Sequence, residues 1–122
     1  MIFKSVFKII PIPVFYVKNF KDGFAGKSNG FFIRIVEDYK DDIGLLEHEI
    51  QHCRQFFKTL LMHGLLYKFS KKYRYKAELE CYRIQLTYCE NKEHSLNRFA
   101  TFLSKKYDLN ITYEQALKDL SQ

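Results

Sequence analysis

The side-chain pattern of this chain changes near residue 40, and that change limits the folds open to it. Before it, β-branched and aromatic residues form two short blocks, 14–17 and 31–36, separated by a stretch of turn residues, 22–30. Blocks of this kind predict two or three antiparallel strands. After residue 42, apolar side chains recur at three- and four-residue spacings, which is typical of amphipathic helices. Strands followed by helices predict an α+β fold.

Three to four helices are expected over the rest of the chain. Asp41 or Asp42 can cap the first of them, and Gly64 could end it early. The second should stop at Asn91, and residues 112–115 resemble a capping box for the last. The expected helices cover residues 43–66, 73–90 and, in a C-terminal pair spanning 95–120, residues 95–107 and 112–120.

The length of 122 residues suits a single domain, 1–122, because two separate cores of half that size would each be marginal. Hydrophobic side chains make up 47% of the chain, which is enough for one core. The three cysteines, Cys53, Cys81 and Cys89, are odd in number and lack C-x-x-C spacing. They argue against a disulfide framework and favour a reducing compartment.

The charge of the chain is basic, with a formal net charge of +6. Such a balance can attract nucleic acid or anionic lipid, but it also occurs in ordinary domains. The basic aromatic stretch 68–76 could track phosphates and stack bases, although a solvated helix start with inward tyrosines is the favoured interpretation. Lys4 and Lys8 interrupt the apolar N-terminus, which resembles neither a signal peptide nor a membrane span. We expect a cytoplasmic protein, with weak attachment of the N-terminal segment to a membrane surface left open.

His48 and His52 stand four residues apart on the first expected helix, so both imidazoles project from one face. Two neutral imidazoles at that separation can share one tetrahedral zinc ion. Glu49 lies about 100° further round the helix, within reach of a water on that ion without ligating it. Such a carboxylate can act as a general base, since zinc lowers the pKa of the water. The alternative is that both histidines are ordinary helix residues.

A third ligand is needed, because a catalytic zinc ion usually has three protein ligands and one open position. His63 shares the helical face but lies roughly 16 Å further along a continuous helix, which excludes it. On the second expected helix, Glu78 and Glu80 point about 200° apart, so one face cannot present both. Aromatic and apolar neighbours place Glu78 inward, where it needs either a metal ion or a basic side chain. Glu80 belongs to the solvated face, where an exposed ion pair would explain it.

The two helices together resemble the gluzincins, zinc peptidases whose third ligand is a glutamate on a second helix. The resemblance is carried by His48-Glu49-Ile-Gln-His52 and by Glu78-Leu-Glu-Cys-Tyr-Arg83, and it covers mainly residues 44–90. It is strongest to the minimal members, the minigluzincins, and to peptidases with the pattern Glu-x-x-Ala-Asp. In that pattern the first glutamate is the ligand, which again selects Glu78.

The chain departs from the family pattern at identifiable positions. Cys81 takes the place of the alanine, and Tyr82 replaces the aspartate that braces a ligand histidine, so another acceptor must do so. Arg54 stands where such helices usually carry an apolar residue. The related metzincins have glycine and a ligand where this chain has Gln55 and Lys58, so that class is excluded.

The resemblance implies a minimal zincin-like domain that hydrolyses peptide bonds with Zn²⁺ as cofactor. The implied zinc ligands are His48, His52 and Glu78, with Glu49 as general base. Tyr82, one turn from Glu78, is the first choice for stabilising the oxyanion. Other candidates for that role are Tyr75, His63 and His94. An extended peptide or protein substrate would pair with an edge strand, for which residues 31–36 are the candidate.

A second hypothesis from another class is a small non-catalytic module, either zinc-containing or simply basic, that binds nucleic acid or protein. The peptidase hypothesis expects about one zinc ion per chain. It also expects that Glu49→Gln abolishes cleavage while the metal stays bound.

Overall fold

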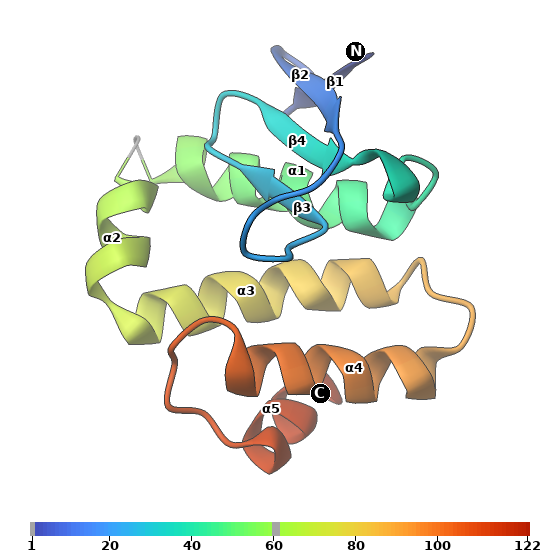
Figure 1. Ribbon diagram of the computed structural model, residues 1–122. Coiled ribbons are helices and arrows are strands. Elements are labelled where there is room, and N and C mark those ends of the chain that lie inside the picture. The colour runs from blue at the N-terminus through green and yellow to red at the C-terminus, as the bar shows by residue number, and fades with distance from the viewer. Residues whose placement is uncertain (1, 60–61) are drawn as a thin grey trace.

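The computed structural model describes residues 2–59 and 62–122, where four strands are followed by five helices (Figure 1). The strands are β1 (Ile2–Val6), β2 (Ile10–Val17), β3 (Gly26–Ser28) and β4 (Ile33–Val36), and a 3₁₀ turn, Glu37–Tyr39, follows them. The helices are α1 (Ile43–Lys58), α2 (His63–Phe69), α3 (Lys71–Leu86), α4 (Lys92–Lys105) and α5 (Tyr113–Leu120). The predicted α+β order, with N-terminal strands before the helices, is confirmed.

The four strands form one mixed sheet in the order β1-β2-β4-β3. β1 and β2 form an antiparallel hairpin and β3 pairs antiparallel with β4, but β2 and β4 are parallel, with Val14 opposite Ile33. The expectation of antiparallel strands alone is therefore wrong. The segment between β2 and β4 is long enough for the crossover connection that parallel strands need, and part of this segment forms β3. As a result β4, the main part of the expected edge strand 31–36, lies between two strands, and β3 is at the edge.

Helix α1 packs between the sheet and α3, and α4 lies on the other side of α3 (Figure 1). One apolar cluster joins the sheet to α1, with buried Val6, Ile12, Val14, Ile33, Ile35, Leu45, Ile50 and Cys53. A second joins α3, α4 and α5, with buried Leu79, Tyr82, Phe99, Ala100, Leu103, Leu109, Ala116 and Leu120. Most of the buried polar residues come from α1 and α3, which meet between these clusters: His48, Glu49, His52, Gln55, Glu78 and Gln85.

Helix α1 ends earlier than the sequence predicts. Its last residue is Lys58, so the expected single helix over 43–66 is wrong. The hydroxyl of Thr59 donates to backbone carbonyls of the last turn and helps to satisfy the end of the helix. Gly64 does not end α1 but belongs to the separate helix α2. Residues 60–61, which the prediction included, lie outside the described residues.

Side-chain caps mark the N-termini of α1, α3, α4 and α5. Asp42 caps α1 and Thr112 caps α5, both as expected. Asn91 does not stop α3, which has already ended at Leu86, but caps α4, and this helix therefore begins three residues earlier than expected. Ser70 caps α3, which begins two residues earlier than expected.

Candidate metal centre

The two histidines of α1 face α3 and are buried. His48 is 3% exposed and His52 is 8% exposed, and their ring centroids lie 5.1 Å apart. The two helices can approach closely here because Gly44, one turn before His48, has no side chain. A Cβ on Gly44 would lie 3.2 Å from the backbone carbonyl oxygen of Gln85 on α3. The glycine thus brings the histidine face of α1 against α3.

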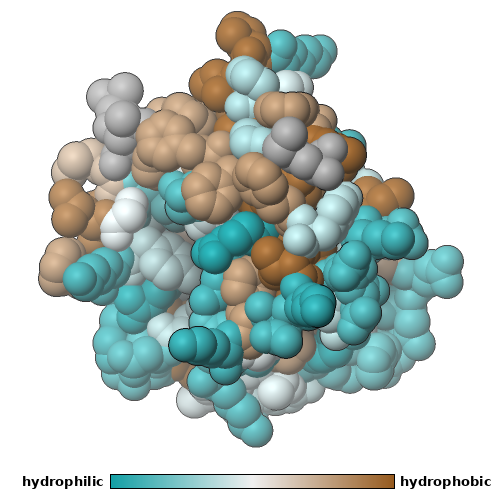
Figure 2. Space-filling model, turned by 45° about the horizontal axis from the view of Figure 1, so that its top comes forward, coloured by the Kyte–Doolittle hydropathy of each residue, from teal (hydrophilic) through white to brown (hydrophobic). Residues whose placement is uncertain are grey.

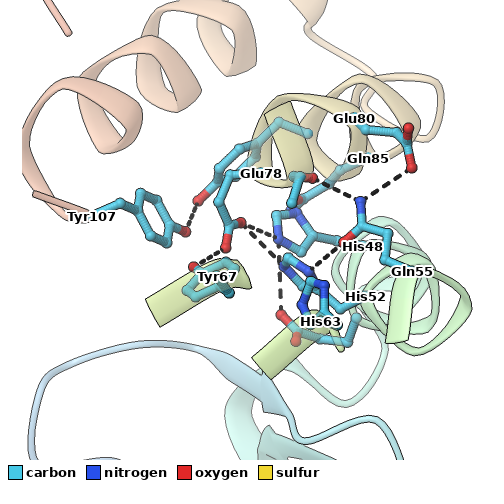
Figure 3. A network of polar contacts seen from close by, with 12 residues as sticks. His48, His52, Gln55, His63, Tyr67, Glu78, Glu80, Gln85 and Tyr107 are labelled. Carbon is cyan, nitrogen blue, oxygen red and sulfur yellow. Dashed lines mark hydrogen bonds and ion pairs between the residues drawn. The ribbon is translucent and has the colours of Figure 1, made fainter. Parts of the chain in front are cut away.

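Glu78 reaches the histidine pair from α3 (Figure 3). Its Oε1 lies 3.2 Å from Nε2 of His48 and 3.1 Å from Nε2 of His52, and the residue is 2% exposed. The predicted inward position of Glu78 is confirmed, and so is the exposure of Glu80. Glu80 accepts hydrogen bonds from glutamine amides of α1, and across residues 2–59 and 62–122 it lacks the expected ion pair. Within those same ranges Glu78 has no lysine or arginine partner, so the imidazoles are its charge partners.

Gln55 fixes the orientation of His52. Its Oε1 lies 3.0 Å from Nδ1 of His52, while its amide group donates to the Ala77 carbonyl at 3.0 Å and to Glu80 at 3.1 Å. Both partners of the amide group are acceptors, so the amide cannot be turned round. Nδ1 of His52 therefore carries a proton, and Nε2 is the nitrogen that faces Glu78.

Gln85 orients the other histidine in a similar way. Its Oε1 lies 2.9 Å from Nδ1 of His48. The sequence predicts that some acceptor must replace the bracing aspartate lost at Tyr82, and two glutamine side chains occupy that role. Neither glutamine is identifiable from the sequence motif. Gln55 follows His52 by three residues, and Gln85 follows Glu78 by two helical turns, so helical spacing is the only available signal.

The charges of the centre require a cation between the imidazoles and the carboxylate. A neutral imidazole would direct its Nε2 lone pair at Oε1 of Glu78, so a proton or a metal ion must separate them. Burial alone lowers the pKa of His52, but the Cys81 sulfur and the Glu78 carboxylate raise it well above the ordinary value. Burial opposes ionisation of Glu78 as well, but the two histidines hold its pKa below the ordinary value. A metal ion can replace the proton, so the donor set fits one.

Cys81 adds another donor to the centre. The side chain is fully buried one turn along α3 from Glu78, and its Sγ lies within 4.8 Å of a ring nitrogen of each histidine. Buried His48, His52 and Cys81 therefore lie close enough to bind a metal ion. Burial raises the pKa of the Cys81 thiol to about 12, so the thiol keeps its proton unless a cation displaces it. The sequence predicts only that Cys81 takes the place of a small alanine, although its spacing from Glu78 already puts both on one helix face.

Glu49 lies beside the histidines on the side facing the sheet. Its Oε2 is 4.0 Å from Nε2 of His48. Gly26 of β3 packs against it, since a Cβ there would lie 3.3 Å from Cγ of Glu49. Burial raises the pKa of Glu49 above its ordinary value, and His48 and His52 offset this only in part. A carboxylate with a raised pKa accepts a proton more readily near neutral pH.

A cleft of about 670 Å³ opens onto these groups, and His48, Glu49, His52 and Glu78 all line it. Its other walls come from β3 and the loop after it, from α2, and from residues 106–108. Gly30 is required in this loop because its φ is +95° and a Cβ would lie 2.3 Å from the Phe56 ring. The centre is therefore open to a ligand that enters the cleft.

The early end of α1 brings α2 against the centre. The ring of His63 lies 5.9 Å from that of His52, so the exclusion based on a continuous helix does not hold. Burial and His52 lower the pKa of His63 to about 4, and its Nδ1 contacts the Tyr73 hydroxyl at 2.7 Å. Tyr75 and His94 do not line the cleft, since Tyr75 bonds to α5 and His94 is exposed at the start of α4.

Three tyrosines surround the two histidines and Glu78. Tyr67 of α2, which the sequence motif does not identify, donates its hydroxyl hydrogen bond to Oε2 of Glu78. Tyr82 packs its ring 4.4 Å from that of His48, and its hydroxyl lies 2.6 Å from the hydroxyl of Tyr107. Tyr67 and Tyr107 line the large cleft, whereas Tyr82 lines a smaller cavity beside it.

No family model, no curated protein and no solved structure matches the chain at a significant level. Over the described parts of the chain, each helix is too short or too polar to cross a bilayer.

Proposed function

We propose that this protein is a zinc-dependent metallopeptidase similar to the gluzincins. The observation that carries the proposal is the convergence of His48, His52 and Glu78 from two helices. Nε2 of the histidines lies 3.2 and 3.1 Å from Oε1 of Glu78, and all three residues are buried. Two imidazoles and one carboxylate form a known ligand set of catalytic zinc, with a fourth position for water. When bound, zinc would lower the pKa of that water and polarise a peptide carbonyl.

Glu49 is the proposed general base. It lines the cleft next to His48. Its carboxylate is not the one that both histidines contact, which belongs to Glu78. In this role it takes a proton from the attacking water and passes it to the leaving amine. Its burial keeps bulk water away from the carboxylate, and its raised pKa favours protonation during the reaction.

β3 is the proposed docking strand for an extended peptide substrate. It is an edge of the sheet and it lines the cleft beside Glu49. An edge strand offers backbone groups that a peptide can pair with as an added strand. This assignment replaces residues 31–36, because β4 is paired on both sides.

Stabilisation of the oxyanion is assigned to a tyrosine of the cleft. Tyr82 remains the sequence-based candidate, and its contact with Tyr107 lets it act by orienting that hydroxyl. Tyr67 is a second candidate because its hydroxyl touches Glu78 at the centre itself. Separate Tyr67→Phe and Tyr82→Phe variants rank the two. Loss of the donor should lower kcat by about a hundredfold or more while zinc stays bound.

A second candidate function rests on Cys81. Its Sγ lies within reach of the same ion as His48 and His52. Together with Glu78, its thiolate would complete a shell of four protein ligands, as in structural zinc sites. The protein would then be a non-catalytic zinc-containing module. Cobalt separates the two functions, because a thiolate ligand gives an intense near-ultraviolet charge-transfer band that Cys81→Ser removes. The peptidase proposal expects no such band in the wild type.

Nucleic-acid binding through the basic stretch 68–76 remains a weaker proposal. Tyr73 and Tyr75 of this stretch are half-buried and their hydroxyls contact His63 and Asp119, so their rings are partly withdrawn from base stacking. The observation supports the interpretation of this stretch as a solvated helix start with inward tyrosines.

Cleavage of an unstructured protein such as casein by zinc-loaded protein tests the peptidase proposal. Glu49→Gln should lower the rate by about a hundredfold or more while zinc content is unchanged. The matched control is Glu47→Gln, the same change on the same helix but outside the cleft lining. Equal losses in both variants would exclude Glu49 as the base. Zinc bound at full occupancy without any cleavage would favour the closed site with Cys81.

A further inference from the structure

The tip of the β1–β2 hairpin presents apolar side chains to solvent. Phe7 is 52% exposed and Ile9 is 82% exposed, and Phe3 on β1 is 61% exposed. Figure 2 shows apolar side chains gathered toward the hairpin end of the molecule, with hydrophilic side chains over the helical end. Clustered apolar exposure of this kind marks an interaction site in a folded domain.

The backbone of the tip is strained at two non-glycine positions. Ile9 N–H donates to the Val6 carbonyl at 3.2 Å and closes a β-turn inside the three-residue loop between the paired residues Val6 and Ile10. Both central residues, Phe7 at φ +55° and Lys8 at φ +62°, adopt the left-handed conformation that Asn-Gly satisfies best. A bulky aromatic and a long cation at these positions are unfavourable for folding. Strain of this sort is retained where function requires it.

The charged side chains of the hairpin and of the chain just after it have a single sign. The first 21 residues contain Lys4, Lys8, Lys18 and Lys21 and no acidic residue. Lys4 and Lys8 have no ion-pair partner among the described residues. Apolar side chains interleaved with free cations combine the two contributions that hold a peripheral protein on an anionic bilayer.

We propose that the β1–β2 hairpin docks this protein on the surface of an anionic lipid bilayer, with Phe7 and Ile9 inserted among the headgroups. Lys4 and Lys8 then lie at the level of the lipid phosphates. A second copy of the chain fits less well, because two lysine-rich hairpins would repel each other. The proposal is independent of the peptidase function, since none of these residues contacts the metal centre.

Sedimentation of the full chain with lipid vesicles tests the proposal. Binding is expected to vesicles of phosphatidylcholine with phosphatidylglycerol at about one lipid in three, and it should weaken with added salt. Vesicles of phosphatidylcholine alone should bind on the order of tenfold less protein. No binding to the anionic vesicles, or self-association through the hairpin in its place, would overturn the proposal.

Two double variants separate the apolar and the charged contributions. Phe7→Ser with Ile9→Ser should weaken binding to anionic vesicles about tenfold or more. Lys4→Gln with Lys8→Gln should weaken it by a similar factor and remove most of its salt dependence. The control is Tyr88→Ser, an exposed aromatic residue outside the hairpin, which should bind as the wild type does. A loss of the same size in Tyr88→Ser would contradict docking through the hairpin.

A third variant distinguishes a membrane role from a structural one. Replacing the tip by the favoured turn, Phe7→Asn with Lys8→Gly, relieves the backbone strain and should raise Tm. The same change removes one apolar anchor and one cation, so vesicle binding should fall. If Tm falls and vesicle binding is retained, the tip serves folding and the proposal fails.

Discussion

At the interface of α1 and α3, polar side chains are buried and partnered, whereas at the β1–β2 hairpin apolar side chains are exposed. Glu78 is 2% exposed and contacts both His48 and His52, while Ile9 is 82% exposed at the tip of a strained turn. Both regions run against the ordinary pattern of polar outside and apolar inside. A sequence usually keeps such departures where function needs them.

The difference between the regions lies in what each departure does to folding. In the interface every polar group depends on its neighbours, because Gln55 orients His52 and His52 offsets the charge of Glu78. Deleting one member leaves the others buried and unsatisfied. In the hairpin the side chains of Phe7 and Ile9 are largely exposed and bury little apolar surface. Truncating one of them should therefore leave the fold unchanged. The comparison therefore predicts opposite responses to substitution.

The largest effect is expected for Glu78→Ala. It leaves two buried imidazoles without their carboxylate, and the free energy of unfolding of the metal-free protein should fall by about 3–5 kcal/mol. Urea unfolding followed by circular dichroism measures this change. Glu80→Ala, two residues away on the exposed face, is the matched control and should cost less than about 1 kcal/mol. Similar losses in the two variants would show that the interface is not a coupled network.

A smaller effect is expected for Gln55→Ala. The variant removes the acceptor that orients His52, so zinc affinity should fall about 10- to 100-fold with little change in fold. Competition with a chromophoric chelator measures the affinity. Gln51→Ala is the control, because Gln51 bonds to Glu80 and contacts neither histidine. Unchanged affinity in Gln55→Ala would remove this glutamine from the metal centre.

The pH dependence of stability should be specific to the metal-free protein. Because the pKa of His52 is raised in the folded state, its contribution is complete below the ordinary value of 6.5 and is lost as pH rises through the folded value. His63, whose pKa is lowered to about 4, is neutral in this range and does not interfere. Tm of the metal-free protein should therefore fall as pH rises above 6.5. Zinc replaces the proton, so the zinc-loaded protein should not show this fall. A rise of Tm over this range without metal would contradict the assignment.

The smallest effect on folding is expected in the hairpin. Ile9→Ser should change the free energy of unfolding by less than about 0.5 kcal/mol, because the side chain is almost fully exposed. Thermal unfolding by calorimetry checks this value, and vesicle binding of the same variant should weaken. A loss of stability comparable with that of Glu78→Ala would erase the distinction between the two regions.

Local patterns were sufficient to predict which side chains of the two helices face inward. Helical spacing alone puts His48 and His52 on one face, and it separates Glu78 from Glu80 by half a turn, as the burial of each confirms. The order of strands and helices follows from periodicity in the same way. The caps at Asp42 and Thr112 were also predictable, because capping is decided within one helical turn.

The remaining features depend on contacts between distant segments. Gln85 meets His48 only because Gly44 lets two helices approach, which no local pattern encodes. Tyr67 and His63 reach the centre because α1 stops at Lys58. A helix continuing to residue 66, as predicted, would have carried both residues away from the centre. The pairing of β2 with β4 is likewise decided by how the chain crosses over, so the docking edge could not be assigned correctly.

The metal content of the purified wild-type protein tests the central claim most directly. After dialysis against metal-free buffer containing a weak chelator, inductively coupled plasma mass spectrometry should find about one zinc ion per chain. His48→Ala, His52→Ala and Glu78→Ala should each reduce that value strongly, while His94→Ala, at an exposed site on α4, should not. Wild-type protein that is folded and binds no zinc, even when zinc is added back, would contradict the metal centre and the peptidase function with it.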